Sequence, residues 1–441
     1  MNDSIYLNDI AGYDEEKAEA KKIIEVLKNH QKYADIGAYI PKGLILSGNP
    51  GVGKTMLAKA IASESNVPFY EFESNESETE SETIKSIKDL FKKARQHAPS
   101  IIFIDELDEL VMTADFRSDY SRKTTKILLT EIDGISSSDG ILVIATTNYR
   151  PMLPPSLVRS GRMDKRITVE MPSLLDREAI FKLYLNKNEL LKNIDAHQLA
   201  IKTPNFSGAD IKTLVNETII DCASQGIETI TIQDFERNIP VVMFQDIRKR
   251  SKSGPDDMTC YHEIGHFIAE YKTTGQIGSI SIERYGQVQG HVFFDEEVIE
   301  FEPITRNNLK KKLVTMLGGL AGEEVMCGDV TSGSSEDVGK ARKNIQLLMN
   351  VGAFGFDKLL PRVRLGRLSS EEFPVSESKL KSIEDYECEL LSDAYEKAKA
   401  LIEGNKTLAK MLYNELKEKG KLSKKEIEVI LQSFKDSGEQ Q

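Results

Sequence analysis

The sequence predicts an α/β domain with a parallel sheet and flanking helices, followed by a mostly helical second half. Three short apolar runs, Gly43–Ser47, Ile101–Ile104 and Ile141–Ala145, are each followed at once by glycine or polar residues. Continuous apolar runs of this length are typical of strands buried on both faces of a parallel sheet. Further along the chain, Asp176–Leu185 and Gly208–Ala223 carry apolar residues at helical spacing, which indicates helices.

Length and composition bound the class of protein. The chain has 441 residues, 40% of them apolar and 29% charged, which predicts a soluble protein of two or three domains. Its net charge of −12 argues against nucleic acid as the main partner, because phosphate binding requires a basic surface. Residues 1–13 lack the apolar core of a signal peptide, and no run approaches the roughly 18 apolar residues of a membrane helix.

The cysteines indicate a reducing compartment. The four of them show no CxxC spacing: Cys222, Cys260, Cys327 and Cys388. Such scattered cysteines are typical of reduced thiols. We therefore expect a cytoplasmic protein, or a membrane-associated one if membrane helices precede this chain in a longer protein.

The first predicted strand leads into a glycine-rich segment, residues 48–55, that matches the phosphate-loop pattern GxxxxGK[ST]. A helix is predicted directly after it, at Met56–Ala62. In this strand–loop–helix context the backbone N–H groups of residues 51–54 point at phosphates, because glycine permits a close approach. Lys54 is expected to reach the β- and γ-phosphates, and the Thr55 hydroxyl to bind Mg²⁺. The alternative, a tight turn without a ligand, is disfavoured by the match over the whole pattern.

Two further strands end in polar groups that suit ATP hydrolysis. Asp105 and Glu106 follow the second apolar run, and Asn148 follows the third. The carboxyl ends of parallel strands face the ligand crevice. We expect Asp105 to hold Mg²⁺, Glu106 to polarise the attacking water and Asn148 to orient it. A solvated acidic strand end and a turn-forming asparagine are the alternatives.

Arg159 and Arg162 bracket a glycine three residues apart. Exposed arginines usually serve only as surface charge. In an oligomeric ATPase they instead act as arginine fingers that stabilise charge on the γ-phosphate of a neighbouring subunit.

The second half contains a metal-binding pattern. A linker is predicted at residues 240–257, and a helix at Met258–Tyr271 carries the sequence HExxH. His262 and His266 lie four residues apart on one face of this helix, as zinc chelation requires, and Glu263 is placed to take a proton from a water at the metal. The alternative is a pair of structural histidines.

Several segments resemble the FtsH family of AAA+ ATP-dependent zinc metalloproteases. They are Asp9–Gly12, the phosphate loop, Ile101–Glu106, Ala145–Asn148, Arg159–Arg162, Phe206–Asp210, the HExxH helix and Thr331–Val338. This resemblance covers nearly the whole chain and implies a P-loop AAA+ domain, a helical lid and a mostly helical zinc metallopeptidase domain. It implies nucleotide contacts from Ala11, Gly12, Asn49, Pro50, Gly51, Val52, Gly53, Lys54, Thr55 and Met56. It also implies that Asp337 is the third zinc ligand, although an acid at that position is by itself more often a helix cap.

The resemblance further concerns the surroundings of the zinc site. A helix at Gly318–Glu324 is expected to pack near the HExxH helix, with Glu323 or Glu324 bonded to a ligating histidine. Leu320 stands where the family usually has arginine. Short strands at Ile280–Ile282 and Gly290–Phe294 are expected to offer an edge to an extended substrate, and His291 is expected to be structural.

The chain departs from the family in the segment that grips substrate. The family threads substrate with an aromatic–glycine loop after the strand that is Val67–Phe72 here. Residues 71–82 are instead acidic, with no glycine and no aromatic residue after Phe72. We expect this segment to form a negative channel mouth, lined by Glu73, Glu76, Glu78, Glu80 and Glu82, that attracts basic chains and grips weakly.

These observations predict residues 1–173 as the AAA+ nucleotide-binding domain, 174–239 as the lid, 240–257 as the linker and 258–441 as the metallopeptidase domain. The leading hypothesis is a homo-hexamer that uses ATP, Mg²⁺ and Zn²⁺ to process unfolded or partly folded proteins. The alternative is a remodelling chaperone ring with a weak or accessory protease domain. A zinc peptidase that uses nucleotide only to assemble is disfavoured, because Glu106 and both arginines are present.

Overall fold

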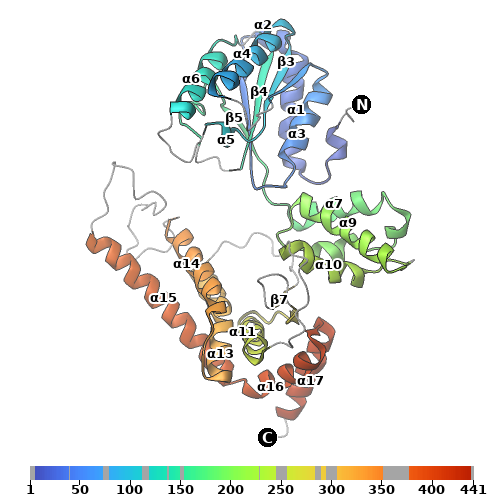
Figure 1. Ribbon diagram of the computed structural model, residues 1–441, viewed down its shortest axis with the longest axis vertical. Coiled ribbons are helices and arrows are strands. Elements are labelled where there is room, and N and C mark those ends of the chain that lie inside the picture. The colour runs from blue at the N-terminus through green and yellow to red at the C-terminus, as the bar shows by residue number, and fades with distance from the viewer. Residues whose placement is uncertain are drawn as a thin grey trace. The chain divides into compact units, whose positions relative to one another are not determined.

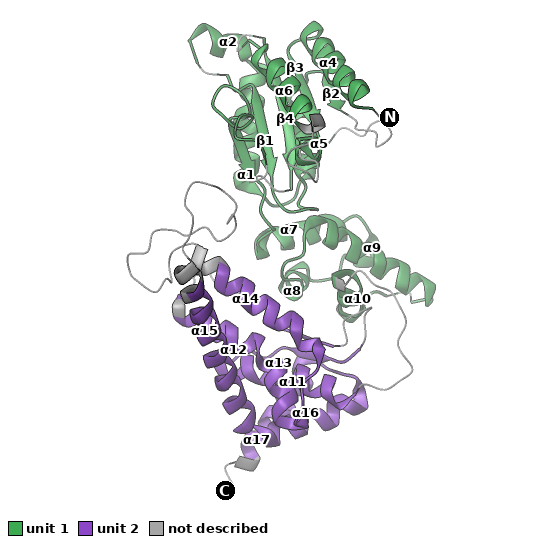
Figure 2. Cartoon of the chain, turned by 60° about the vertical axis from the view of Figure 1, so that its left-hand side comes forward, with its two compact units in different colours: residues 1–243 green, residues 244–441 purple. Residues whose placement is uncertain are grey.

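The computed structural model describes residues 5–38, 40–72, 79–111, 119–136, 139–148, 153–227, 229–244, 256–283, 290–294, 305–350 and 377–438. The chain divides into two compact units, Met1–Met243 and Phe244–Gln441, which Figure 2 shows in green and purple. Among the described residues, no helix is both long enough and apolar enough to cross a membrane.

The first unit contains a parallel sheet of β1 (Gly43–Ser47), β2 (Phe69–Phe72), β3 (Ser100–Ile104), β4 (Ile141–Thr147) and β5 (Lys165–Thr168), in the order β2-β3-β4-β1-β5. β1, β3 and β4 are buried along their whole length, as their continuous apolar sequences predict. The helices of this part lie on both faces of the sheet (Figure 1): α1 (Asp14–Lys28), α2 (His30–Asp35), α3 (Lys54–Ser65), α4 (Glu80–Gln96), α5 (Leu107–Val111) and α6 (Asp119–Asp133).

Register brings the carboxyl ends of the central strands to one edge. Ser47 pairs with Thr147, and Ile104 pairs with Ala145. The residues that follow these strands therefore emerge side by side at that edge, and they are the ones that the sequence predicts to bind nucleotide.

The predicted acidic segment is shorter than we expected. Glu71 and Phe72 belong to β2, whereas Glu80 and Glu82 belong to the first turn of α4. Thr79 and Glu82 form a capping box, in which Glu82 Oε2 accepts the Thr79 backbone N–H at 2.8 Å. Glu80 and Glu82 are therefore helix residues and not loop residues, and residues 73–78 lie outside the described part of the chain.

The rest of the first unit is helical: α7 (Leu174–Leu185), η3 (Glu189–Leu191), α8 (Ala196–Lys202), α9 (Gly208–Ser224) and α10 (Ile232–Phe244). Ser173 and Ser207 cap α7 and α9 through capping boxes with Asp176 and Asp210. α10 continues through Pro240, so residues 240–244, which we assigned to the linker, are helical. The physical reason is burial, because Val242 is only 6% exposed. Residues 245–255 of the predicted linker lie outside the described part of the chain, and its last residue, Asp257, is the first residue of α11.

The second unit is mostly helical. Its elements are α11 (Asp257–Thr274), α12 (Arg306–Met316), α13 (Gly318–Cys327), η4 (Ser332–Ser334), α14 (Ser335–Asn350), α15 (Glu377–Glu403), α16 (Lys406–Lys419) and α17 (Lys424–Gly438), with β6 (Ser279–Ser281), β7 (His291–Phe293) and β8 (Lys421–Leu422). The three strands pair antiparallel in the order β7-β6-β8. Buried residues of α11, such as Phe267 and Ile268, join those of α12, α15 and α16 in one core.

α11 and α13 cross with their backbones in close contact. A Cβ atom at Gly265 would lie 2.1 Å from the carbonyl oxygen of Gly318, which no other residue type tolerates without a shift. This crossing places the first turns of α13 against the helix that carries His262 and His266.

Candidate functional sites

The phosphate loop connects β1 to α3, and carbonyl groups of the loop bind the side chain of Lys54. The Lys54 ammonium donates hydrogen bonds to the carbonyl oxygens of Gly48 (2.9 Å) and Asn49 (2.8 Å) and to Asn148 Oδ1 (2.8 Å). Burial lowers the pKa of Lys54, while the carboxylates of Asp105 and Glu106 act in the opposite direction. Gly51 and Gly53 have φ values of +77° and +100°, which only glycine adopts readily.

The acids at the end of β3 lie at the same edge. The Thr55 hydroxyl donates to Asp105 Oδ2 at 3.2 Å, so the two predicted Mg²⁺ ligands are neighbours. Glu106 follows with a positive φ of +50°, and Asn148 Nδ2 lies 3.5 Å from Glu106 Oε1. The structure thus brings together the five side chains that the sequence assigned to ATP hydrolysis within one chain: Lys54, Thr55, Asp105, Glu106 and Asn148.

The other predicted nucleotide contacts lie next to the lid. The Tyr13 backbone N–H, directly after Ala11 and Gly12, donates to Asp176 Oδ1 of α7 at 2.8 Å. The carbonyl oxygen of Gly51 accepts the Ala209 backbone N–H of α9 at 3.1 Å. Pro50 and Met56 are exposed, Asn49 is exposed beside them, and Val52 is buried.

The two predicted arginine fingers differ in their surroundings. Arg159 is exposed. Arg162 forms a two-pronged ion pair with Asp133 of α6, with Nε–Oδ1 and Nη2–Oδ2 distances of 2.7 Å, and Nη1 donates to the carbonyl oxygen of Ser156 at 2.7 Å. Hydrogen bonding to Arg162 lowers the pKa of Asp133. We did not predict this partner, because sequence alone does not show that residues 133 and 162 are adjacent.

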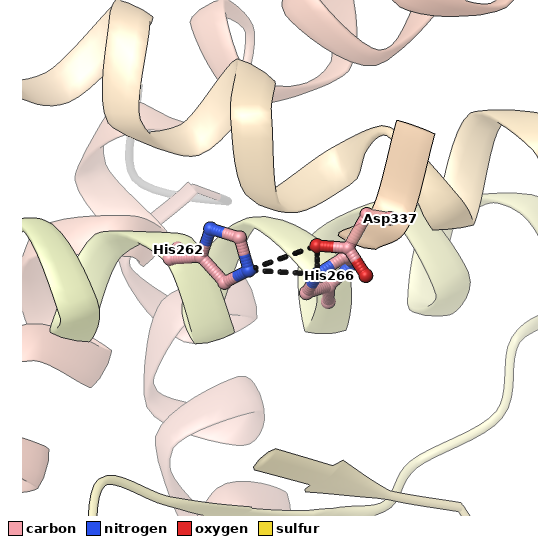
Figure 3. A group of neighbouring side chains, drawn as sticks. All are labelled: His262, His266 and Asp337. Carbon is pink, nitrogen blue, oxygen red and sulfur yellow. Dashed lines mark hydrogen bonds and ion pairs between the residues drawn. The ribbon is translucent and has the colours of Figure 1, made fainter. Parts of the chain in front are cut away.

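In the second unit, His262, His266 and Asp337 point their polar atoms at one another (Figure 3). The Nε2 atoms of His262 and His266 are 3.1 Å apart, and Asp337 Oδ2 lies 3.2 Å and 3.3 Å from them. A tetrahedral zinc ion with bonds of about 2.0–2.1 Å holds its ligands roughly 3.3–3.4 Å apart. Two imidazoles and one carboxylate at this spacing therefore fit a zinc site with a fourth position left for water or substrate.

The outer nitrogens of both histidines are held by hydrogen bonds. His266 Nδ1 lies 2.8 Å from the carbonyl oxygen of Thr315, which can only accept, so this nitrogen carries a proton and Nε2 is left for a metal. His262 Nδ1 lies 2.6 Å from Glu323 Oε1. Burial lowers the pKa of His262, but hydrogen bonds to Asp337 and Glu323 outweigh it and raise this pKa to about 10.

The structure distinguishes the two glutamates that the sequence left as alternatives. Glu323 is 1% exposed, contacts His262, and is itself held by the Thr331 backbone N–H at 2.5 Å and the Ser334 hydroxyl at 3.0 Å. Glu324 instead pairs with Lys399 at 2.9 Å and contacts Tyr395. The contact from the Thr315 carbonyl was missed, because a backbone acceptor leaves no signature in the sequence.

Two backbone segments shape the space around these side chains. Glu263 is 6% exposed, and burial raises its pKa. A Cβ atom at Gly290, just before β7, would lie 2.7 Å from Glu263 Oε1, so this backbone closely borders the carboxylate. A Cβ atom at Gly319 would lie 2.5 Å from His266 Nε2 and 2.7 Å from His262 Nε2, so only glycine leaves the ligand atoms clear.

Comparison with known proteins gives three family matches: ATPase family associated with various cellular activities over residues 44–171, AAA+ lid domain over 193–237, and Peptidase family M41 over 249–430. The chain is 34% identical to ATP-dependent zinc metalloprotease FtsH 2 of Petrotoga mobilis, across 98% of this chain and 72% of that protein. The chain belongs to the FtsH family. It is also 34% identical to FtsH of Thermotoga maritima (91% and 68% covered) and 33% to FtsH of Acholeplasma laidlawii (92% and 65%).

These matches confirm the predicted FtsH resemblance and the predicted fold class, an AAA domain with a five-stranded parallel sheet, lid helices and a mostly helical M41 domain. They also confirm the two enzyme classes, AAA ATPase and M41 zinc metalloprotease, and the His262, His266 and Asp337 group fits the second of them. The chain spans about two thirds of the length of the FtsH relatives it matches.

Proposed function

We propose that this FtsH-family chain is an ATP-dependent zinc endopeptidase that acts as a homo-hexameric ring on unfolded or partly folded proteins. One observation carries the proposal: three ligand atoms are spaced for zinc beside a buried glutamate, in a chain that also gathers the side chains of an ATPase site. The relatives are named ATP-dependent zinc metalloproteases, which supports the same combination.

In the proposed ATPase site, Lys54 exchanges its present partners for phosphate oxygens. The carbonyl groups of Gly48 and Asn49 and the amide of Asn148 now occupy its three donors. Thr55 and Asp105 would hold Mg²⁺, which neutralises charge on the phosphates. Glu106 accepts the proton of the attacking water, and Asn148 orients it.

The arginines are proposed to act between subunits. Arg159 is exposed, and Arg162 is held by Asp133 and Ser156 in a defined orientation. Positive charge delivered to the γ-phosphate of a neighbouring chain stabilises the transition state of phosphoryl transfer. Head-to-tail contacts form a ring when the rotation between neighbouring subunits closes, as the proposed hexamer requires.

In the proposed protease site, His262, His266 and Asp337 would hold Zn²⁺, which supplies Lewis acidity for peptide hydrolysis. Glu263 takes a proton from the attacking water at a carboxylate oxygen and later gives it to the leaving amine nitrogen. Its raised pKa suits both transfers, because the group must be able to carry the proton between them.

The proposed substrate is an extended polypeptide. β7 is an outer strand in the described order β7-β6-β8, and the backbone before it borders Glu263. Pairing of a substrate strand with β7 would bring its peptide groups past the carboxylate. Unfolded or partly folded proteins offer such extended segments.

We propose a cytoplasmic location, because the four cysteines are free thiols, which are typical of a reducing compartment.

The test is cleavage of an unstructured, basic polypeptide by the 441-residue chain with zinc supplied. The assay compares ATP, no nucleotide, and the Glu106→Gln variant with ATP. We expect cleavage only where ATP is hydrolysed. Equal cleavage in all three arms would contradict ATP-driven proteolysis.

The second candidate function is a remodelling chaperone with a weak protease domain, favoured by the lack of aromatic and glycine residues in residues 73–78. ATP-dependent release of a trapped unfolded protein, without peptide products, would support this candidate over the first.

A further inference from the structure

A buried hydroxyl lies directly beneath the two acids of the ATPase site. Thr146, near the carboxyl end of β4, is 1% exposed, whereas Asp105 and Glu106 are exposed. Thr146 Oγ1 donates a hydrogen bond to Asp105 Oδ1, and it accepts one from the Glu106 backbone N–H at 2.8 Å. Thr146 is not among the residues proposed to bind phosphate or Mg²⁺ or to activate water.

The two hydrogen bonds fix the direction of the hydroxyl proton. A threonine hydroxyl has one proton to donate and lone pairs that accept. The Glu106 N–H can only donate, so Thr146 accepts there and its own proton goes to Asp105, which accepts when ionised. A single side chain therefore orients the carboxylate of Asp105 and positions the backbone of Glu106.

Glu106 depends on such support. Its φ of +50° lies in the left-handed region, where a residue with a Cβ atom is disfavoured and persists only when its surroundings hold it. Asp105 also accepts from the Thr55 hydroxyl at 3.2 Å. Thr146 thus joins the pair of residues proposed for Mg²⁺ to the residue proposed to activate water.

We propose that Thr146 is a positioning residue for ATP hydrolysis, an inference that rests on the proposed ATPase function. It acts through Asp105 and Glu106, with which its hydroxyl forms hydrogen bonds. Packing of β4 does not require the hydroxyl, because valine has the same branched shape and suits a buried strand. Thr147 cannot replace it, because successive side chains of a strand point to opposite faces.

The test compares Thr146→Val, which removes the hydroxyl and keeps the branched shape, with Thr146→Ser, which keeps the hydroxyl. Steady-state ATP hydrolysis by the full chain is measured over a range of Mg²⁺ concentrations. Binding of a fluorescent ATP analogue is measured with Mg²⁺ and with EDTA. Thermal unfolding of each variant reports its stability.

We expect Thr146→Val to lower kcat about 10-fold and to raise the Mg²⁺ concentration for half-maximal activity about 5-fold, because a hydrogen bond to a charged group is lost. KM for ATP at saturating Mg²⁺ and analogue affinity in EDTA should stay within about 2-fold, since Lys54 and the loop are untouched. Thr146→Ser should remain within about 3-fold of the unaltered chain in every measurement.

A matched control removes another buried hydroxyl of the same unit. Thr218 of α9 is fully buried, and its hydroxyl donates to the carbonyl oxygen of Leu214 at 2.8 Å. Thr218→Val should lower the unfolding temperature without changing kcat or the Mg²⁺ requirement. An equal change of both quantities in Thr218→Val and Thr146→Val would show a general effect of lost stability and would overturn the inference.

Two further outcomes separate this inference from the function it rests on. If Thr146→Val leaves kcat and the Mg²⁺ requirement unchanged, or if Thr146→Ser shows the same losses as Thr146→Val, the proposed role of Thr146 is overturned. Neither result would contradict the proposed ATPase function. Failure of the unaltered chain to hydrolyse ATP would contradict the proposed ATPase function. In that case the binding assay still tests the role of Thr146. If Mg²⁺ raises the affinity for the ATP analogue equally in the unaltered chain and in Thr146→Val, the inference is overturned.

Discussion

The zinc-binding group and the nucleotide-binding edge differ in whether their side chains already lie in the arrangement that their proposed roles require. The ligand atoms of His262, His266 and Asp337 already lie 3.1 to 3.3 Å apart. At the edge of the sheet, Lys54 is instead bound to carbonyl groups of its own loop, and Arg162 is bound to Asp133. The ligand atoms of the first group are already spaced for zinc, whereas the proposed roles of Lys54 and Arg162 require them to exchange their hydrogen-bond partners.

The difference follows from the elements that carry the side chains. His262 and His266 lie on α11, which crosses α13 closely, and Asp337 lies in the first turn of α14. Hydrogen bonds to Glu323 and to the Thr315 carbonyl fix the outer nitrogens of the two histidines. The nucleotide edge is formed by the loops that follow the strands and by the first turn of α3, and Asp105 and Glu106 are exposed there. Packed helices hold side chains in one arrangement, while loop ends can change partners when a ligand or subunit binds.

The largest expected effect tests whether the zinc group works independently of the nucleotide edge. His266→Ala should lose both zinc and peptide cleavage, because a ligand is removed. Glu263→Gln should keep one zinc per chain and lose cleavage by about 10³-fold, since the general base is gone. Zinc content is measured by elemental analysis and cleavage with an unstructured substrate.

ATP hydrolysis is the control for both protease variants, because the two groups lie in separate compact units. We expect it to remain within about 2-fold of the unaltered chain. A matching loss of ATPase activity in Glu263→Gln would contradict the independence of the two sites.

The next effect tests whether the nucleotide edge needs a second chain. Arg162→Ala should lower kcat for ATP hydrolysis by about 10³-fold with nearly unchanged nucleotide affinity, because a finger acts on the transition state. Arg166→Ala is the matched control, since Arg166 is an exposed arginine nearby in the sequence that donates to the Val158 carbonyl. If specific ATPase activity stays constant on dilution to a verified monomer, action between subunits is excluded.

A smaller effect tests how the zinc group is held. Glu323→Gln should raise the zinc dissociation constant about 10- to 100-fold, because it weakens the charged contact to His262 Nδ1. Glu324→Gln, one residue along, should change it less than about 2-fold, because Glu324 faces Lys399 and Tyr395. Titration with a competing zinc chelator measures both constants, and equal effects would contradict the assigned contact.

The smallest effect concerns substrate choice. Glu73, Glu76 and Glu78 lie outside the described residues, and their charge predicts attraction of basic chains that salt screens over a Debye length of about 8 Å under physiological conditions. Raising salt should slow degradation of a basic unstructured polypeptide severalfold and that of a neutral one less than about 2-fold. Rapid ATP-dependent degradation of a stable acidic protein would instead show a strong grip and contradict this expectation.

The sequence by itself predicted the architecture and the identity of the chemical groups. The patterns that carried these predictions are local: apolar runs of strand length, the phosphate-loop glycines and the HExxH spacing. Each can be recognised without knowledge of its neighbours in the tertiary structure. The same locality explains the misplaced start of the linker at Pro240 and the overlong acidic segment. Burial of Val242 extends α10, and the capping box of Thr79 begins α4 at Glu80.

Only the tertiary structure decided which distant groups meet. Residue spacing brought His262 and His266 to one helix face, but the crossing of α11 and α13 selected Glu323 over Glu324. The packing of α12 against α11 placed the Thr315 carbonyl at His266. The pairing of β3 with β4 brought Thr146 under Asp105 and Glu106, and the packing of α6 brought Asp133 to Arg162. These contacts join residues 29 to 61 positions apart. Chain folding alone sets such neighbours, because hydrogen bonds depend on distance in space and not on separation along the sequence.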